Sequence, residues 1–395
     1  MLTSSSTCSV RSMIKEGLLA IRRARSTGLG AGSPARSGLT LVLLVATARC
    51  DGCKEVAAPA TQLDFEPADA RLLSIGSPTK DEDPSVLRAR DGSLFVAWFS
   101  DRGGNSDIYI TRTRDGREWS APARVTNNAG GDFYPSLLQD DQGTFHLVWF
   151  RWTAPFQGNI WYNSSPDGLT WDSAREVQVT RASDVDDWVP SLARAANGTL
   201  LVYFVSQRRF ASTTPTSDLY VSVKRPESAT WDPVVGVSGV NSPTEGDHLP
   251  FATRTGNQIT LIWVRHDRSQ PIPWADPPPK SDLVYATSPD GLTWTTPRRI
   301  TNEAGDVVNL FPALYQDMQG EWSILWLSTR QGSPKVFELP LANSDRYPQA
   351  IVEDTVLPPG YSHRIVATSR PGVYLGVWVQ GPEGAQDIYY RFFRK

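Results

Sequence analysis

Polar side chains that could bind a ligand recur at a fixed place before a proline. Five points of the chain carry an acid or its amide three residues ahead of a proline: Asp81, Asp132, Asp187, Asp247 and Asn309. Tyr361 takes this place at a sixth point. Brought together in a ring, such groups could hold a cation or the hydroxyls of a polar sugar. They could instead accept backbone N–H bonds within turns, which is a structural role.

The sequence lacks the patterns that several other enzyme classes need. The four histidines do not have the spacing of zinc ligands, no glycine-rich phosphate loop precedes a helix, and no serine nucleophile elbow is present. Residues 1–49 hold seven basic side chains and one acidic one, which leaves the rest of the chain with a formal charge of −9. That charge argues against nucleic acid as a partner. No cofactor is expected, with calcium on the acidic loops as the alternative.

Six aromatic residues, each near the end of a short apolar run, show that the chain is a repeat protein. They recur at intervals of 51, 54, 60, 63 and 52 residues: Trp98, Trp149, Tyr203, Trp263, Trp326 and Trp378. The first five follow a proline by 13 or 14 residues, and Arg364 holds the equivalent place in the sixth unit. Repeats of this length indicate one large domain over residues 71–395.

Each repeat predicts one four-stranded sheet. The first unit has short runs at residues 84–87, 94–99, 107–110 and 124–126, separated by turn signals such as Asp-Gly. Runs rich in β-branched and aromatic residues between such turns are typical of antiparallel hairpins. Six units therefore predict an all-β fold, a six-bladed β-propeller. The last unit has only three strands, so we expect residues 71–75 to complete it and close the ring.

A second motif lies in the turn between the third and fourth runs. Residues 165–171 and 288–294 both read SPDGLTW, and residues 113–119 repeat the pattern with Thr113, Asp115, Gly116 and Trp119. This motif resembles the Asp box of the sialidase superfamily and of other BNR-repeat propellers. Its physical role is structural, because the Asp and Ser or Thr side chains hold the turn and Gly adopts a backbone conformation that other residues resist. The motif therefore predicts the fold and says little about activity.

The resemblance to sialidases extends to single residues. In that family a tyrosine near the start of the last blade is the nucleophile, a glutamate two blades earlier is its base, and an aspartate of the first blade is the acid and base. Arginines bind the carboxylate of the substrate. The resemblance assigns the catalytic roles here to Tyr361, Glu245 and Asp107, and it implies substrate contacts by Arg102, Arg265 and Arg330. A carboxylate must take the phenol proton, and arginine binds a carboxylate with two parallel hydrogen bonds.

Two features depart from the sialidase pattern. Glu82 stands two residues before the first-blade proline, where the family has an arginine. Aspartates also begin the third strand of other units at positions 218, 282 and 387, so a structural role at the strand entry is an alternative for Asp107.

Glycan binding without catalysis is the competing function. Trp188 and Trp274 could offer flat faces to sugar rings while the acidic ring, Asp81, Asp132, Asp187 and Asp247, supplies hydrogen bonds. We therefore expect a monomeric, carbohydrate-recognising propeller whose partner is a glycan or glycoconjugate, with exo-α-sialidase activity as its enzymatic form. A structural or protein-binding propeller is the third alternative.

The N-terminal segment predicts export. Residues 39–48 (LTLVLLVATA) form an apolar run behind an Arg-rich leader, too short to span a bilayer but typical of an export signal. Residues 1–53 end either at a small-residue cleavage site at 46–48 or at a lipid-accepting Cys50 or Cys53, and residues 54–70 resemble a linker. We expect a periplasmic, cell-surface lipoprotein or extracellular location, with membrane attachment only through a lipid. A disordered tail with a chance apolar run is the alternative.

Overall fold

The computed structural model describes residues 65–74, 79–154, 158–182, 185–208, 217–267, 280–346, 352–353, 357–358, 360–382 and 384–395. The predicted export signal, Trp274 and most of the predicted linker lie outside these residues. In the described part, regular structure is β-strand apart from two short 3-10 helices, η1 (Ser173–Arg175) and η2 (Leu341–Arg346). No described helix is long and apolar enough to cross a membrane.

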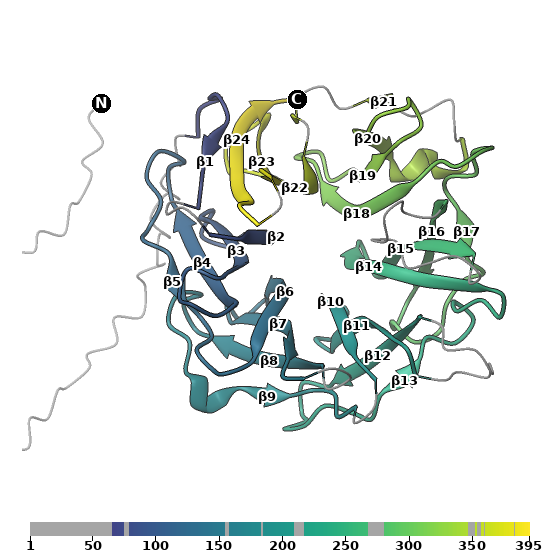
Figure 1. The fold of residues 1–395 in the computed structure, drawn as a ribbon, viewed down its shortest axis with the longest axis horizontal. Coiled ribbons are helices and arrows are strands. Elements are labelled where there is room, and N and C mark those ends of the chain that lie inside the picture. Colours follow the sequence, from purple (N-terminus) through teal and green to yellow (C-terminus); the bar gives the residue numbers. More distant parts are fainter. Residues whose placement is uncertain are drawn as a thin grey trace, which may run out of the picture. The chain divides into compact units, whose positions relative to one another are not determined.

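Six four-stranded antiparallel sheets stand in a ring, which confirms the six-bladed β-propeller (Figure 1). Blades one to three consist of β2 (Asp81–Arg88), β3 (Leu94–Ser100), β4 (Asp107–Thr113) and β5 (Ala123–Arg124); β6 (Gly131–Gln139), β7 (Phe145–Trp152), β8 (Asn159–Ser165) and β9 (Val177–Gln178); and β10 (Asp187–Arg194), β11 (Leu200–Ser206), β12 (Asp218–Lys224) and β13 (Val235–Gly236). Blades four to six consist of β14 (Glu245–Thr255), β15 (Gln258–Asp267), β16 (Ser281–Ser288) and β17 (Arg298–Arg299); β18 (Asn309–Gln316), β19 (Trp322–Ser328), β20 (Lys335–Pro340) and β21 (Val352–Glu353); and β22 (Tyr361–Ala367), β23 (Val373–Gln380), β24 (Asp387–Arg394) and β1 (Arg71–Leu72).

The second strand of each blade carries the core. Every residue of β3 and of β11 is buried, because neighbouring blades cover both faces of these strands. This explains why the strands are continuous apolar runs rather than alternating patterns. The repeated aromatic residue is the centre of the packing, since Trp98, Trp149, Tyr203 and Trp263 are fully buried and Trp326 is 1% exposed. The hydrophobic clusters around these residues join adjacent blades.

The ring closes as predicted, by pairing of the two ends of the domain. In β1, Arg71 lies opposite Tyr390 and Leu72 opposite Tyr389 of β24. Packing begins earlier than the sequence suggested, because Phe65 is fully buried and its ring lies 5.4 Å from that of Phe392. The domain therefore includes residues 65–70, which the composition assigned to a linker.

The SPDGLTW turns have the hydrogen bonds that their residues predict. Ser165 Oγ donates to Asp167 Oδ1 (3.0 Å), and the same carboxylate oxygen accepts the backbone N–H groups of Leu169 and Thr170 at 2.9 and 2.7 Å. These bonds hold the pKa of Asp167 down to about 2 against the effect of burial. Gly168 has a φ of 73°, which only glycine adopts without cost. The first strand of each blade is the innermost one (Figure 1). The SPDGLTW turns lie at the end of the blades where these innermost strands finish. We call this end the turn face.

The structure corrects the register of the sixth blade by one residue. Tyr361 pairs with Val379 as Glu82 pairs with Phe99 in blade one, so Tyr361 corresponds to Glu82 and not to Asp81. Gly360 and His363 therefore take the acid and proline positions that the spacing assigned to Tyr361 and Arg364. The spacing misled because the stretch from the proline position to the core tryptophan is one residue longer in this blade. A side chain would not fit at Gly360, where a Cβ would lie 2.5 Å from the Val379 carbonyl oxygen.

Candidate functional site at the channel mouth

The innermost strands place one residue from each blade around the central axis. A bulge interrupts each of these strands, and the residue before the proline position has a left-handed φ of 47–55° in all six blades. These residues are Asp83, Tyr134, Val189, Leu249, Phe311 and Ser362. They all line one narrow cavity of about 70 Å³ on the axis. We call the end of the channel where the innermost strands begin the channel mouth.

A tyrosine and a glutamate meet at the channel mouth. The Tyr361 hydroxyl donates a 2.6 Å hydrogen bond to Glu82 Oε1, between the last blade and the first. Lys80 Nζ lies 3.1 Å from the other Glu82 oxygen, and the Phe311 ring lies 5.8 Å from the Tyr361 ring. The side chain of Glu82 is only 14% exposed. The mouth therefore presents a phenol, a carboxylate, an ammonium group and an aromatic face within one small area.

Burial controls the protonation of these groups. It raises the pKa of Tyr361, and the hydrogen bond to Glu82 raises it further. The phenol is thus a protonated hydrogen-bond donor at neutral pH. Burial and the charge of Glu82 raise the pKa of Asp83 to about 8. Adjacent carboxyl groups at the mouth consequently differ in environment, and Asp83 is mostly protonated at pH 7.

The predicted acidic ring is buried and binds the protein itself. Asp81, Asp132, Asp187 and Asp247 are all fully buried. In three blades the acid accepts a hydrogen bond from the core tryptophan indole, at 3.0 Å for Trp98 to Asp81, 3.0 Å for Trp149 to Asp132 and 2.7 Å for Trp263 to Asp247. Asn309 accepts the same bond from Trp326 at 3.1 Å. The ring residues join the innermost strand to the core of the blade.

Arginines from the end of the second strand neutralise the same acids. Arg102 Nη2 lies 3.0 and 3.2 Å from the Asp81 oxygens, Arg151 binds Asp132 at 2.7 and 3.0 Å, and Arg265 binds Asp247 at 2.7 and 3.1 Å. Arg208 pairs with Asp187 in blade three. Two of the arginines expected to bind a substrate carboxylate, Arg102 and Arg265, therefore have an internal carboxylate partner. The third, Arg330, lies 3.8 Å from Glu303.

Blades three and six depart from this arrangement for reasons visible in their sequences. Blade three has Tyr203 where the others have tryptophan, and its hydroxyl donates to the Gly291 carbonyl instead (2.8 Å). One oxygen of Asp187 consequently has no hydrogen bond within the described part of the chain. In blade six the acid position is Gly360, and Trp378 donates to Gln380 Oε1 at 3.2 Å.

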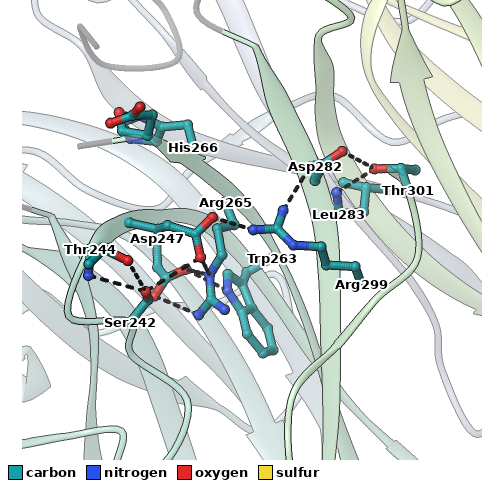
Figure 2. A network of polar contacts seen from close by, with 12 residues as sticks. Ser242, Thr244, Asp247, Trp263, Arg265, His266, Asp282, Leu283, Arg299 and Thr301 are labelled. Atoms are coloured by element: carbon teal, nitrogen blue, oxygen red, sulfur yellow. Dashed lines mark hydrogen bonds and ion pairs between the residues drawn. The ribbon is translucent and has the colours of Figure 1, made fainter. Parts of the chain in front are cut away.

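Blade four holds a separate polar network around Arg265 and Arg299 (Figure 2), and Glu245 belongs to this network. Arg299 pairs with Glu245 and with Asp282, the latter at 2.7 Å, and Glu245 Oε2 lies 3.9 Å from Arg265 Nε. These residues line a polar cavity of about 530 Å³. The Tyr361 hydroxyl thus bonds Glu82, while Glu245 pairs with arginines of blade four.

Asp107 lies at the entry to the third strand of blade one. It is fully buried, pairs with Arg124 and accepts a hydrogen bond from Thr126 Oγ1 at 3.2 Å. Asp282 has the same two partners in blade four, Arg299 and Thr301. Burial raises the pKa of both acids. This repetition supports the structural alternative for Asp107.

Of the two tryptophans predicted to contact sugar rings, Trp188 lies among the described residues. Trp188 is half-buried at the start of β10. It packs against two hydrophobic clusters, one between blades three and four and one between blades two and three. Trp274 lies outside the described residues. In the described part, no group of three or more His, Cys, Asp and Glu side chains is arranged to hold a metal ion.

Comparison with known proteins finds solved structures with a similar fold. An α-L-arabinanase of Penicillium chrysogenum complexed with arabinobiose has a TM-score of 0.61 and 18% identity, over 80% of this chain and 93% of that one. An α-L-arabinofuranosidase of Fusarium graminearum has a TM-score of 0.60 and 16% identity over the same shares. The NanB sialidase of Streptococcus pneumoniae, a K499G mutant, has a TM-score of 0.54 and 9% identity, over 80% of this chain and 68% of that one. No protein-family model and no curated protein matches the sequence. At these identities the likeness shows the six-bladed fold.

Sequence reasoning missed Glu82 and Asp83 as members of the site. Glu82 was noted only as a departure from the sialidase pattern, because nothing in the sequence indicated that Tyr361 would be its neighbour. The consecutive acids Asp81, Glu82 and Asp83 before Pro84 were the available signal, since such a run occurs before no other repeat proline. In the structure the first of them is buried in the blade, and Asp83 lines the axis beyond Glu82.

Proposed function

We propose that this protein recognises an uncharged carbohydrate at the channel mouth. The observation that carries the proposal is the hydrogen-bonded pair of Tyr361 and Glu82, beside the aromatic face of Phe311. Carboxylate and phenol groups bind sugar hydroxyls, and an aromatic ring covers the apolar face of a sugar. Solved structures with this fold include an α-L-arabinanase complexed with arabinobiose, which is an uncharged sugar.

The charges at the site favour an uncharged ligand over a sialic acid. A sugar carboxylate requires cationic partners. Arg102 and Arg265 are each paired with a buried aspartate, and Lys80 lies 3.1 Å from Glu82. The mouth also has a glutamate where the sialidase pattern has an arginine. These contacts support neutral sugars, such as arabinofuranosyl units, as the substrate class.

Hydrolysis of a glycosidic bond is the second candidate, and one observation favours it. The raised pKa of Asp83, about 8, leaves one carboxyl group protonated beside Glu82. Glycosidases use two carboxyl groups whose environments separate their pKa values, one as the acid and one as the base or nucleophile. In this scheme Asp83 donates a proton to the leaving oxygen, and Glu82 either activates water or deprotonates Tyr361.

The proposal also covers two predictions from the sequence, one on the SPDGLTW turns and one on export. We propose that the SPDGLTW turns are Asp boxes of the sialidase superfamily and that the chain is exported. A secreted or lipid-anchored location would give the site access to extracellular polysaccharide.

A glycan array and a set of fluorogenic glycosides test the proposed function. We expect binding or turnover of neutral glycosides such as α-L-arabinofuranosides, reduced at least tenfold by Glu82→Gln and by Tyr361→Phe. Glu245→Gln is the matched control and should leave it within twofold of wild type. Turnover of a sialoside that is lost in Glu245→Gln would instead support the sialidase assignment. Absence of any glycan response would favour a protein partner.

A further inference from the structure

Two cavities meet on the axis of the propeller. The narrow one, of about 70 Å³, lies toward the channel mouth, and the other, of about 490 Å³, is lined by later residues of the innermost strands toward the turn face. The residues that line both cavities mark their junction: Ser85, Ser136, Ser191, Phe251 and Arg364. We propose that this junction binds a small oxyanion, held by the guanidinium group of Arg364 and the hydroxyls of Ser85, Ser136 and Ser191.

The three serines come from equivalent positions in blades one to three, directly after the proline. Each hydroxyl oxygen accepts a backbone N–H group of the following blade, at 3.0 Å from Leu137 to Ser85, 3.0 Å from Leu192 to Ser136 and 2.8 Å from Ala252 to Ser191. A hydroxyl can accept and donate at once. Because the oxygen is fixed by the backbone bond and no acceptor for its proton occurs among the described residues, each serine has one O–H bond to offer to a ligand in the channel.

Arg364 occupies the serine position in blade six and adds the positive charge. Its Nη1 donates to the His363 carbonyl at 2.9 Å, and the guanidinium carbon lies 5.5 Å from the centre of the Phe251 ring. No ion pair of Arg364 occurs within the described ranges. Burial lowers its pKa to about 10, so the group is still charged at neutral pH. A partly buried arginine without a carboxylate partner is costly unless an anion accompanies it.

The carboxyl group that lines the narrow cavity does not supply that anion at neutral pH. Asp83 lines the narrow cavity, but its raised pKa of about 8 keeps most of it protonated at pH 7. The junction thus combines a guanidinium group that forms no ion pair within the described ranges with three hydroxyl donors. Such a set matches an acceptor-rich anion, namely a carboxylate, sulfate or phosphate, and does not match a metal ion.

The channel geometry separates this site from the glycan site. The ring of residues at the narrow cavity lies between the junction and the channel mouth, whereas the larger cavity extends along the innermost strands to their last residues, such as Arg88 and Gln316. We therefore expect the anion to enter from the turn face. The inference does not depend on the proposed carbohydrate specificity.

Calorimetric titration with sodium acetate, sulfate and phosphate tests the inference. Titrations are run at pH 6.5 with the ionic strength held constant by sodium chloride. We expect saturable binding of at least one anion with a stoichiometry of one. Arg364→Gln should weaken it at least tenfold, and Ser136→Ala several-fold. Arg254→Gln is the control, because Arg254 is exposed and lines the larger cavity but not the narrow one; the affinity of this variant should stay within twofold of wild type.

Two results would overturn the inference. One is the absence of saturable binding of all three anions to the folded wild-type protein. The other is equal affinity in wild type and Arg364→Gln. If Arg364→Gln does not fold, Arg364→Lys serves instead, because it keeps the charge and loses the planar pair of donors; it should bind with intermediate affinity. Differences among acetate, sulfate and phosphate then show whether a planar or a tetrahedral anion is preferred.

Discussion

The hydroxyl of Tyr361 and the carboxylate of Glu82, 279 positions apart in the chain, form a 2.6 Å hydrogen bond between the last blade and the first. The bond therefore links the candidate site to the closure of the ring. A ligand at the mouth would contact the first and last blades, which lie side by side because the ring is closed.

Removing either partner of this bond should weaken the packing of the last blade against the first. A hydrogen bond to a carboxylate contributes about 1.5 to 3 kcal/mol, and partial exposure reduces this to about 1 to 2 kcal/mol here. We expect that value as the coupling energy in a double-mutant cycle of Tyr361→Phe and Glu82→Gln, measured by urea unfolding. Additive effects of the two substitutions would show that the bond contributes nothing to stability.

The buried pair of Asp247 and Arg265 should be among the most sensitive contacts. Asp247→Ala leaves Arg265 and the Trp263 indole without their shared acceptor, which costs about 3 to 5 kcal/mol in the free energy of unfolding. Asp247→Asn is the matched control, since blade five already has Asn309 in this role. Chemical denaturation should rank wild type, Asp247→Asn and Asp247→Ala in falling order of stability. Equal stability of the two variants would contradict a role for the acceptor oxygen.

The repeat and the closure of the ring were predictable because the same residues recur in six units. Aspartate, tryptophan and arginine recur together in blades one, two and four, so their mutual contacts were also open to inference from their spacing. The partner of Tyr361 was not, because one extra residue between the proline position and Trp378 shifts the register of blade six. Residue intervals along the chain do not report which side chains converge on the axis, so Arg265 matched a family interval although its guanidinium is bound to Asp247.

Glycines in the turns should differ in their tolerance of a methyl group. Gly168 has a φ of 73°, and a Cβ there would lie 2.8 Å from Phe95 and 2.9 Å from Phe145. Gly305 has a φ of 82° with nothing within 4 Å. Gly305→Ala should cost about 1 kcal/mol from backbone strain, and Gly168→Ala about 1 to 3 kcal/mol more from overpacking. Thermal unfolding of both variants measures the difference; equal shifts would mean that the aromatic rings yield easily.

Asp83 should make the stability of the fold fall as the pH rises through the acidic and neutral range. Its folded-state pKa, about 8, lies above its ordinary value of about 4, so the folded protein binds a proton that the unfolded chain loses between these values. Stability falls as the pH rises from about 4 to about 8. Asp83→Asn removes this pH dependence of the stability and keeps a residue that tolerates a positive φ. The variant should melt above wild type at pH 9 and close to it at pH 4. A melting difference that does not change with pH would refute this account.

Phe65 should stabilise the closed ring although it precedes every strand in the described part of the chain. The side chain is fully buried against Phe392, so Phe65→Ala should cost about 3 to 5 kcal/mol. Leu72→Ala, at a side chain 40% exposed in β1, should cost less than about 1 kcal/mol. Calorimetry of both variants distinguishes burial from simple strand pairing. A larger loss in Leu72→Ala would reverse this ranking.

The position of Phe65 also shows at which end of the propeller the chain enters the domain. The chain enters the domain beside Gly116 and Phe392, at the turn face, and β1 then runs toward the channel mouth. Phe65 and the candidate site at the channel mouth therefore lie at opposite ends of the propeller. A substitution at Phe65 can thus be made without altering the groups that line the candidate site.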